Sequence, residues 1–220
     1  MFDSPTTAAD SPHPAEAPPT TGSTPRERRH VATRDEILAA AWELARRDGL
    51  LVISLRALGE RVGLKASSLY SYFGSKGALY DAMFAEGYRE LLDASAGWVG
   101  DVGDADPRSA FVEGNRRFVR FCVDDPVRYQ LLFQRTVPDW EPSPESYGLA
   151  LAFIDRTRAA LAAVGIVDER AVDMWTAIMT GLTSQQISND PGGDRWARLA
   201  DDATEMFLAH YPSRLASRHD

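Results

Sequence analysis

The stretch SLRALGERVGLKASSLYSYFGSKGAL, residues Ser54–Leu79, decides the fold of this chain. Apolar residues recur in it at helical spacing, and Gly63 separates two short helical segments. Glycine tolerates the positive φ that a tight turn between two helices requires. Leu58 and Leu69 lie on either side of that turn, where they would form a small core that fixes the crossing angle of the helices. The stretch therefore predicts a helix-turn-helix over residues 54–73.

The second helix of this motif presents small and hydroxylated side chains at its N-terminal end. Such side chains allow a helix to approach base edges in the major groove of DNA. Leu69 and Phe73 occupy inward positions at i and i+4, so Tyr70 and Tyr72 are expected to face outward, where their hydroxyls can reach phosphates. The motif thus predicts a surface that binds double-stranded DNA.

Two cations flank this helix. Lys76 lies in the first turn of the following helix, where a positive charge opposes the macrodipole, so a phosphate partner would account for it. Arg56 either reads a guanine, grips the DNA backbone or is simply solvated. The positions expected to contact DNA are Ser54, Arg56, Lys65, Ala66, Ser67, Ser68, Tyr70, Tyr72 and Lys76.

Over about residues 31–91 the chain resembles the DNA-binding domain of the TetR family. The resemblance is carried by Leu69-Tyr70-Ser71-Tyr72-Phe73 and by Gly74-Ser75-Lys76-Gly77-Ala78-Leu79. Tyr72 replaces the family's usual His, Gly77 its usual acidic residue and Gly59 its usual Ala. The resemblance implies a homodimeric transcriptional regulator whose C-terminal half binds a small effector, with no cofactor.

The charge of the chain is unevenly distributed. The net charge is −8, but residues 1–25 carry −3, residues 26–80 carry +4 and residues 81–220 carry −9. A basic segment on an acidic body suits a DNA reader, because counterion release favours phosphate contact by that segment alone. The basic cluster Arg26, Arg28, Arg29, His30 and Arg34 lies either along an adjacent minor groove or in solvent.

The remaining pattern predicts an all-α protein with about nine helices, in which a long fourth helix joins the N-terminal domain to a helical bundle. Residues 1–30 are expected to be a disordered Pro- and Thr-rich tail with a basic end, and a helix is expected to begin after Thr33. The fourth helix should run from a Ser75 cap to about Trp98. Residues 105–212 are expected to form the effector-binding and dimerisation domain, and residues 213–220 a second tail. Caps are also predicted at Ser54, Asp106, Asp125, Ser143 and Asp168.

The C-terminal half contains an aromatic stripe and two amphipathic helices. An effector pocket is expected among Phe118, Phe121, Phe133, Trp140, Phe153, Trp175 and Met179, although an aromatic stripe at helical spacing is more often core than cavity. The last two helices carry broad apolar stripes that could pack against a second copy as a four-helix bundle, or within the chain. The expected dimer residues are Ile178, Leu182, Leu199, Ala203, Met206 and Phe207.

Several functional classes find no support in the sequence. Cys122 is the only cysteine and the four histidines lie near the chain ends, so no metal site is expected. No apolar run is long enough to span a bilayer and no signal pattern is present, so a cytoplasmic location without membrane contact is expected. We therefore expect a repressor that a small apolar or amphipathic effector releases from a palindromic operator. The alternatives are a structural DNA binder without effector and a helical enzyme that carries a DNA-binding domain.

Overall fold

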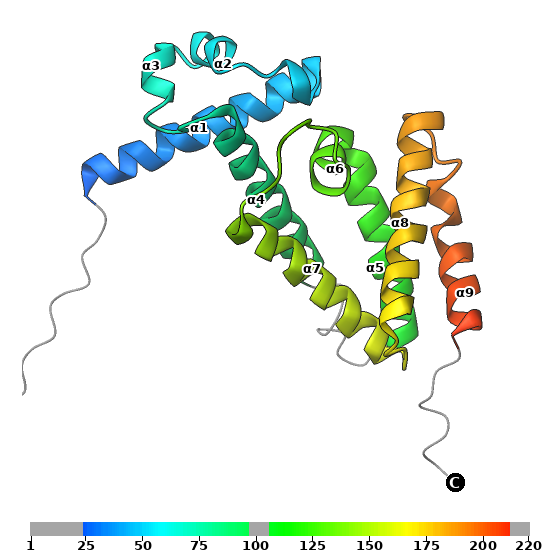
Figure 1. Cartoon of the computed structure of the whole chain (residues 1–220). Coiled ribbons are helices and arrows are strands. Elements are labelled where there is room, and N and C mark those ends of the chain that lie inside the picture. Colours follow the sequence, from blue (N-terminus) through cyan, green and yellow to red (C-terminus); the bar gives the residue numbers. More distant parts are fainter. Residues whose placement is uncertain (1–23, 97–105, 212–220) are drawn as a thin grey trace, which may run out of the picture.

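The computed structural model describes residues 24–96 and 106–211, and every regular element in these ranges is a helix (Figure 1). The predicted all-α class is confirmed. The elements are α1 (Pro25–Asp48), η1 (Leu50–Val52), α2 (Leu55–Arg61), α3 (Ala66–Leu69), α4 (Lys76–Ser95), α5 (Pro107–Asp124), α6 (Pro126–Phe133), α7 (Pro144–Ala163), α8 (Glu169–Asn189), η2 (Ala197–Leu199) and α9 (Ala200–His210). No helix in this part of the chain is long and apolar enough to cross a membrane.

Six of the predicted helix caps are confirmed, because the side chain at each of these N-caps accepts a hydrogen bond from a backbone N–H of the first turn. These residues are Ser54, Ser75, Asp106, Asp125, Ser143 and Asp168. Each cap satisfies a donor that the helix itself cannot pair.

The first helix begins earlier than predicted. Its N-cap is Thr24 rather than Thr33, so residues 25–30 are helical and not part of a tail. Thr24 and Glu27 form a capping box, in which the Thr24 N–H donates to Glu27 Oε2 over 2.7 Å and the Glu27 N–H donates to Thr24 Oγ1 over 3.2 Å. Pro25 adds a preset φ at the first helical position. The predicted tails over residues 1–23 and 213–220, and the predicted end of α4 at Trp98, lie outside the described residues.

The helices form an N-terminal unit and a C-terminal body that share α4 (Figure 1). In the N-terminal unit α1, α2, α3 and the start of α4 enclose a core that includes Leu58, Leu69 and Phe73, all of which are buried. In the body α4 packs along α7, and α5 packs against α8 and α9. Helix α4 therefore runs from one part into the other.

Candidate DNA-binding surface and ligand cavity

The turn between α2 and α3 has the geometry that the sequence predicts. Gly63 has a φ of 68°, which a glycine adopts without steric cost. The Leu64 N–H donates to the Gly59 carbonyl over 2.9 Å, and Gly59 itself is buried. Leu69 and Phe73 point into the core, as predicted. The motif thus holds α3 rigidly while one face of that helix remains open.

The open face of α3 carries the polar side chains expected to contact DNA. Lys65, Ser67 and Ser68 are exposed, and Ala66 opens the helix. Tyr70 is 56% exposed, so its ring does not belong to the core. Ser71 donates its hydroxyl hydrogen to the Ser68 carbonyl over 2.6 Å, which closes the last turn of α3. This face is small and polar, as close approach to a DNA groove requires.

Tyr72 differs from the prediction that it faces outward. Its ring is half-buried and stacks on His30 of α1, with ring centroids 4.5 Å apart and planes within 16°. The stack exists because α1 begins at Pro25 and therefore extends far enough to place His30 beside Tyr72. A DNA contact by Tyr72 remains a prediction, but the ring also fastens α1 to the motif.

Lys76 has partners inside the protein. Its Nζ donates to the Leu51 carbonyl over 2.9 Å and lies 5.3 Å from the centre of the Tyr80 ring. These contacts give the Lys76 ammonium partners within the protein, so its place in the first turn of α4 does not by itself call for a phosphate. Arg56 is 86% exposed and pairs with Glu60 over 3.2 Å. Phosphate contacts by these two cations remain predictions.

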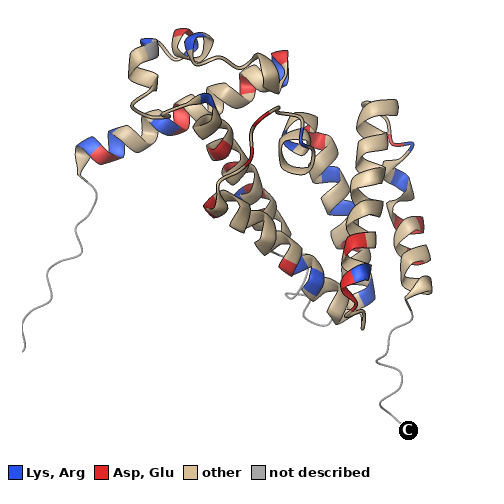
Figure 2. Cartoon of the chain, in the orientation of Figure 1, with Lys and Arg blue, Asp and Glu red and all other residues tan. Residues whose placement is uncertain are grey.

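The basic cluster near the N-terminus is part of a helix and not of a free arm. Lys and Arg lie along α1 and around α2 and α3, with acidic residues between them on α1 (Figure 2). Arg34 lies over the Phe73 ring at 4.9 Å from its centre, so the basic side of α1 lies against the segment that follows α3. A minor-groove contact would therefore require the helix itself to reach the DNA.

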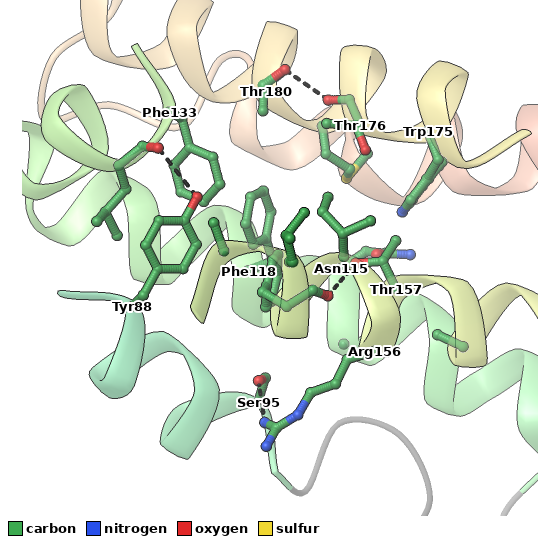
Figure 3. A pocket seen from close by; sticks show the side chains of 18 of the residues that line it. Tyr88, Ser95, Asn115, Phe118, Phe133, Arg156, Thr157, Trp175, Thr176 and Thr180 are labelled. Atoms are coloured by element: carbon green, nitrogen blue, oxygen red, sulfur yellow. Dashed lines mark hydrogen bonds between the residues drawn. The ribbon is translucent and has the colours of Figure 1, made fainter. Parts of the chain in front are cut away.

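A second feature is a cavity of about 280 Å³ in the C-terminal body (Figure 3). Helices α4, α5, α6, α7 and α8 all contribute to its wall. The lining residues are Tyr88, Ser95, Phe111, Gly114, Asn115, Phe118, Leu132, Phe133, Tyr147, Ala150, Leu151, Phe153, Ile154, Arg156, Thr157, Ala160, Trp175, Thr176, Met179 and Thr180. A largely apolar wall with a few polar groups is typical of small-molecule sites.

The structure brings together five of the seven residues expected around an effector, namely Phe118, Phe133, Phe153, Trp175 and Met179. Phe121 does not line the cavity, because it faces the Arg128 guanidinium at 3.6 Å from its ring centre. Trp140 is also absent from the wall: its Nε1 donates to the Gly77 carbonyl over 3.1 Å, and its ring packs against Tyr80 and Phe84. Neither residue lines this cavity, and a contact of either one with an effector stays a prediction.

Several polar lining residues were not predicted. Thr176 and Thr180 lie four residues apart on α8, on the face that also carries Met179. In the sequence, these two polar residues within an apolar helix face were the feature that could have identified them as lining residues. The Thr180 hydroxyl donates to the Thr176 carbonyl over 2.7 Å, and the Thr176 hydroxyl donates to the Val172 carbonyl over 2.9 Å. Tyr88 of α4 donates to the Leu132 carbonyl over 3.2 Å, and burial raises the pKa of its phenol.

A partly buried group of hydrogen bonds holds helix α7 against the beginning of α4. The Asp81 carboxylate accepts from the Ser143 N–H over 2.6 Å, from the Ser143 hydroxyl over 3.0 Å and from the Ser146 hydroxyl over 2.8 Å. Asp81 lies little more than one turn beyond Lys76, whereas α7 forms much of the cavity wall. The cavity and the DNA-binding motif are thus linked through α4 and α7.

The residues expected at a dimer interface differ in exposure. Ile178, Leu182, Leu199 and Ala203 are half-buried, and Met206 is 65% exposed. Phe207 is only 3% exposed and packs on Trp175 and Tyr211, with ring centroids 4.8 Å away in each case. Phe207 therefore belongs to the core of the chain, and its assignment to the interface was wrong. The other five residues leave an apolar face on α8 and α9.

The family model described as "Bacterial regulatory proteins, tetR family" matches residues 37–83. A Mycobacterium tuberculosis protein named HTH-type transcriptional regulator Rv1816 is 32% identical over 174 residues, which cover 74% of this chain and 73% of that protein. The HTH-type transcriptional repressor Rv1353c of the same species is 24% identical over 206 residues, covering 89% and 76% of the two chains.

Two solved structures share this fold at lower identity. The TetR family regulator PfmR from Thermus thermophilus superposes with a TM-score of 0.60 at 21% identity, covering 80% of this chain and 98% of that one. The regulator FadR from Bacillus subtilis, solved in complex with stearoyl-CoA, gives a TM-score of 0.65 at 13% identity, covering 80% and 97%.

Proposed function

Since the chain belongs to the TetR family of bacterial regulatory proteins, we propose that it is a repressor that a small molecule releases from a palindromic operator. The protein is a DNA-binding transcriptional regulator and not an enzyme. The observation that carries the proposal is that one helix, α4, begins beside the exposed recognition helix and contributes Tyr88 and Ser95 to the cavity wall.

The recognition helix α3 would enter the major groove through Lys65, Ser67, Ser68 and Tyr70, which are exposed. These hydroxyls and the lysine can donate to phosphates and to base edges. Lys76 would contact the phosphate backbone at the edge of the groove. Since α3 carries no Arg, Asn or Gln, its serines set a permissive readout, and DNA shape would contribute part of the specificity.

A homodimer would form through the apolar face of α8 and α9. This face includes Ile178, Leu182, Leu199, Ala203 and Met206, and Met174 beside it is 52% exposed. Two-fold symmetry would pair each residue with its copy and produce a four-helix bundle. Recognition helices held about 34–36 Å apart would then read the two halves of a palindrome.

A ligand in the cavity would act on the DNA through α4 and α7. The cavity wall is mostly apolar, which suits a small apolar or amphipathic molecule. Occupation of the cavity would push on α7, and the Asp81 carboxylate would transmit that movement to the first turns of α4. A shift of a few ångströms in the spacing of the two recognition helices would separate them from successive major grooves.

The test is selection of genomic DNA fragments by the purified full-length protein at physiological salt, read by sequencing. The proposal predicts enrichment of a few palindromic sites, and the genes beside those sites would indicate the pathway in which the ligand arises. Uniform recovery of fragments would contradict it and favour a structural DNA binder. The cavity argues against that second function, because a protein that only packages DNA has no need of a ligand site.

A further inference from the structure

The cavity wall contains one charged side chain among the described residues that line it. That residue is Arg156 of α7, and the rest of the lining is aromatic, aliphatic, hydroxylated or amide. A lining without any carboxylate gives no counter-charge to a cationic ligand. The electrostatics of the cavity therefore favour a ligand that is neutral or negative.

Arg156 has no acidic partner in the described part of the chain. Its guanidinium donates through Nη1 to the Leu92 carbonyl and, over 2.8 Å, to the Ser95 hydroxyl. Both bonds use the same nitrogen, so none of the described residues accepts from Nε or Nη2. That edge of a guanidinium binds a carboxylate with two parallel hydrogen bonds. The neighbouring Arg158 differs, because it pairs with Glu169 over 2.7 Å and with Asp155.

Arg156 and Ser95 lie together at one end of the cavity, and Thr176 and Thr180 lie on the opposite wall formed by α8 (Figure 3). The hydroxyl hydrogens of Thr157, Thr176 and Thr180 are donated to backbone carbonyls, so these groups offer lone pairs alone. Between the two ends the wall is built from aromatic rings such as Phe118 and Phe153, which stack with centroids 5.7 Å apart. The cavity thus has one cationic end and an apolar interior.

We infer that the effector is a small organic acid: a carboxylate binds the Nε and Nη2 edge of Arg156, and a compact apolar body lies against the aromatic rings. The inference rests on the proposed function, whose ligand it specifies. A volume of about 280 Å³ lies at the lower limit of ligand pockets, so it suits a body of one or two rings better than a long acyl chain. The same carboxylate would replace water at Arg156 next to the last turn of α4, where Leu92 and Ser95 lie.

The test is calorimetric titration of the full-length protein with two matched pairs of probes. These are 3-phenylpropionate with 3-phenylpropanol, and 2-naphthoate with 2-naphthylmethanol. Each pair shares one apolar body and differs in the charge of its polar group. The acid should bind at least ~10-fold more tightly than its alcohol, since charge-assisted hydrogen bonds to the half-buried Arg156 contribute about that much.

Arg156→Gln should remove the preference for the acid, whereas Arg158→Gln, on the same helix but outside the cavity, should leave it unchanged. Arg156→Lys keeps a positive charge without the two-pronged edge and should retain a reduced preference, and thermal unfolding of each variant reports whether it folds. Failure of both acids to bind, equal binding of acid and alcohol, or a preference that survives in Arg156→Gln would overturn the inference.

The proposed function is tested separately in the same samples, by following release of the selected DNA. An acid that binds in the cavity without releasing DNA would support the ligand class and contradict the release mechanism. Selective DNA binding by a protein that binds neither acid would support the proposed regulator and contradict the proposed ligand class.

Discussion

The two ends of α4 lie in opposite environments. At its start, Lys76 and Tyr80 hydrogen-bond to the Leu51 and Leu50 carbonyls of η1, beside the exposed face of α3. Towards its end, Tyr88 and Ser95 line a mainly apolar cavity. In the proposed function, selectivity for DNA at the first end would depend on exposed polar side chains. Selectivity for a ligand at the second end would depend on the shape of the cavity and on a few polar groups. A helix of 20 residues, about 30 Å long, spans both environments.

Separating the two chains of the proposed dimer should disable the DNA end while sparing the cavity end. Met206→Glu places a charge on the apolar face of α9, so it should weaken dimerisation and lower affinity for a selected palindrome by about 100-fold, through loss of avidity. Sedimentation velocity and DNA titration measure the two effects. Val167→Glu, in the turn between α7 and α8 and outside the predicted interface, is the control. A monomeric variant that binds the palindrome as the parent does would remove the dimer from the account.

Removing the hydrogen bonds between α4 and α7 should leave DNA binding and ligand binding each largely unchanged when measured alone. Asp81→Ala removes the acceptor of three hydrogen bonds from Ser143 and Ser146, so it should lower the free energy of unfolding by about 1–3 kcal/mol. It should also reduce the ligand-induced loss of DNA affinity more than ligand affinity itself. Chemical denaturation and DNA titration with the cavity ligand provide these values.

Asp93→Ala is the matched control, because Asp93 is exposed near the other end of α4. If both variants respond to ligand as the parent does, Asp81 holds the fold together but does not transmit the signal.

A change confined to the DNA end should alter binding to every sequence alike. Lys76→Ala should weaken binding to operator and random DNA equally and reduce the salt dependence of log Kd by about one unit, because one phosphate contact is lost. The bond to the Leu51 carbonyl is lost as well, so unfolding should be measured in parallel. An unchanged salt slope would assign Lys76 to that internal bond alone.

The smallest effect concerns the middle of α4. Partial burial raises the pKa of Glu86, although the hydrogen bond that Trp42 Nε1 donates over 2.5 Å opposes this shift. Since the folded state holds the proton more tightly, stability should fall as pH rises from the ordinary glutamate pKa through the raised one. Glu86→Gln keeps an acceptor for Trp42 and should remove this part of the pH dependence, as thermal unfolding between pH 4 and 7 would report. A variant with the parent's pH profile would show that Glu86 titrates normally.

The contrast between the two ends also explains what could be predicted from the sequence. Caps, turn glycines and inward residues of the motif are local signals, so Ser54, Gly63 and Phe73 could be assigned before the fold was known. The capping box of Thr24 and Glu27 was equally local but lay inside a proline-rich stretch that resembled a tail.

The cavity could be predicted only in part, because it depends on how five helices pack. Phe118 and Phe121 lie one turn apart on α5. Their spacing does not predict which of the two rings lines the cavity and which one packs against a residue from another helix. Phe121 is covered by Arg128, and Trp140 lies in a loop without any periodicity to orient it. Arg156 gave no signal in the sequence, since the role proposed for it depends on which of the described residues folding brings next to its guanidinium.

The most direct test of the account is the affinity of the dimer for a selected palindrome compared with a scrambled duplex of equal length and composition, at one physiological salt concentration. A sequence-specific regulator should bind the palindrome at least ~1,000-fold more tightly. Equal affinities would mean that the open face of α3 contacts only the phosphate backbone, and the account of an operator-reading repressor would be wrong.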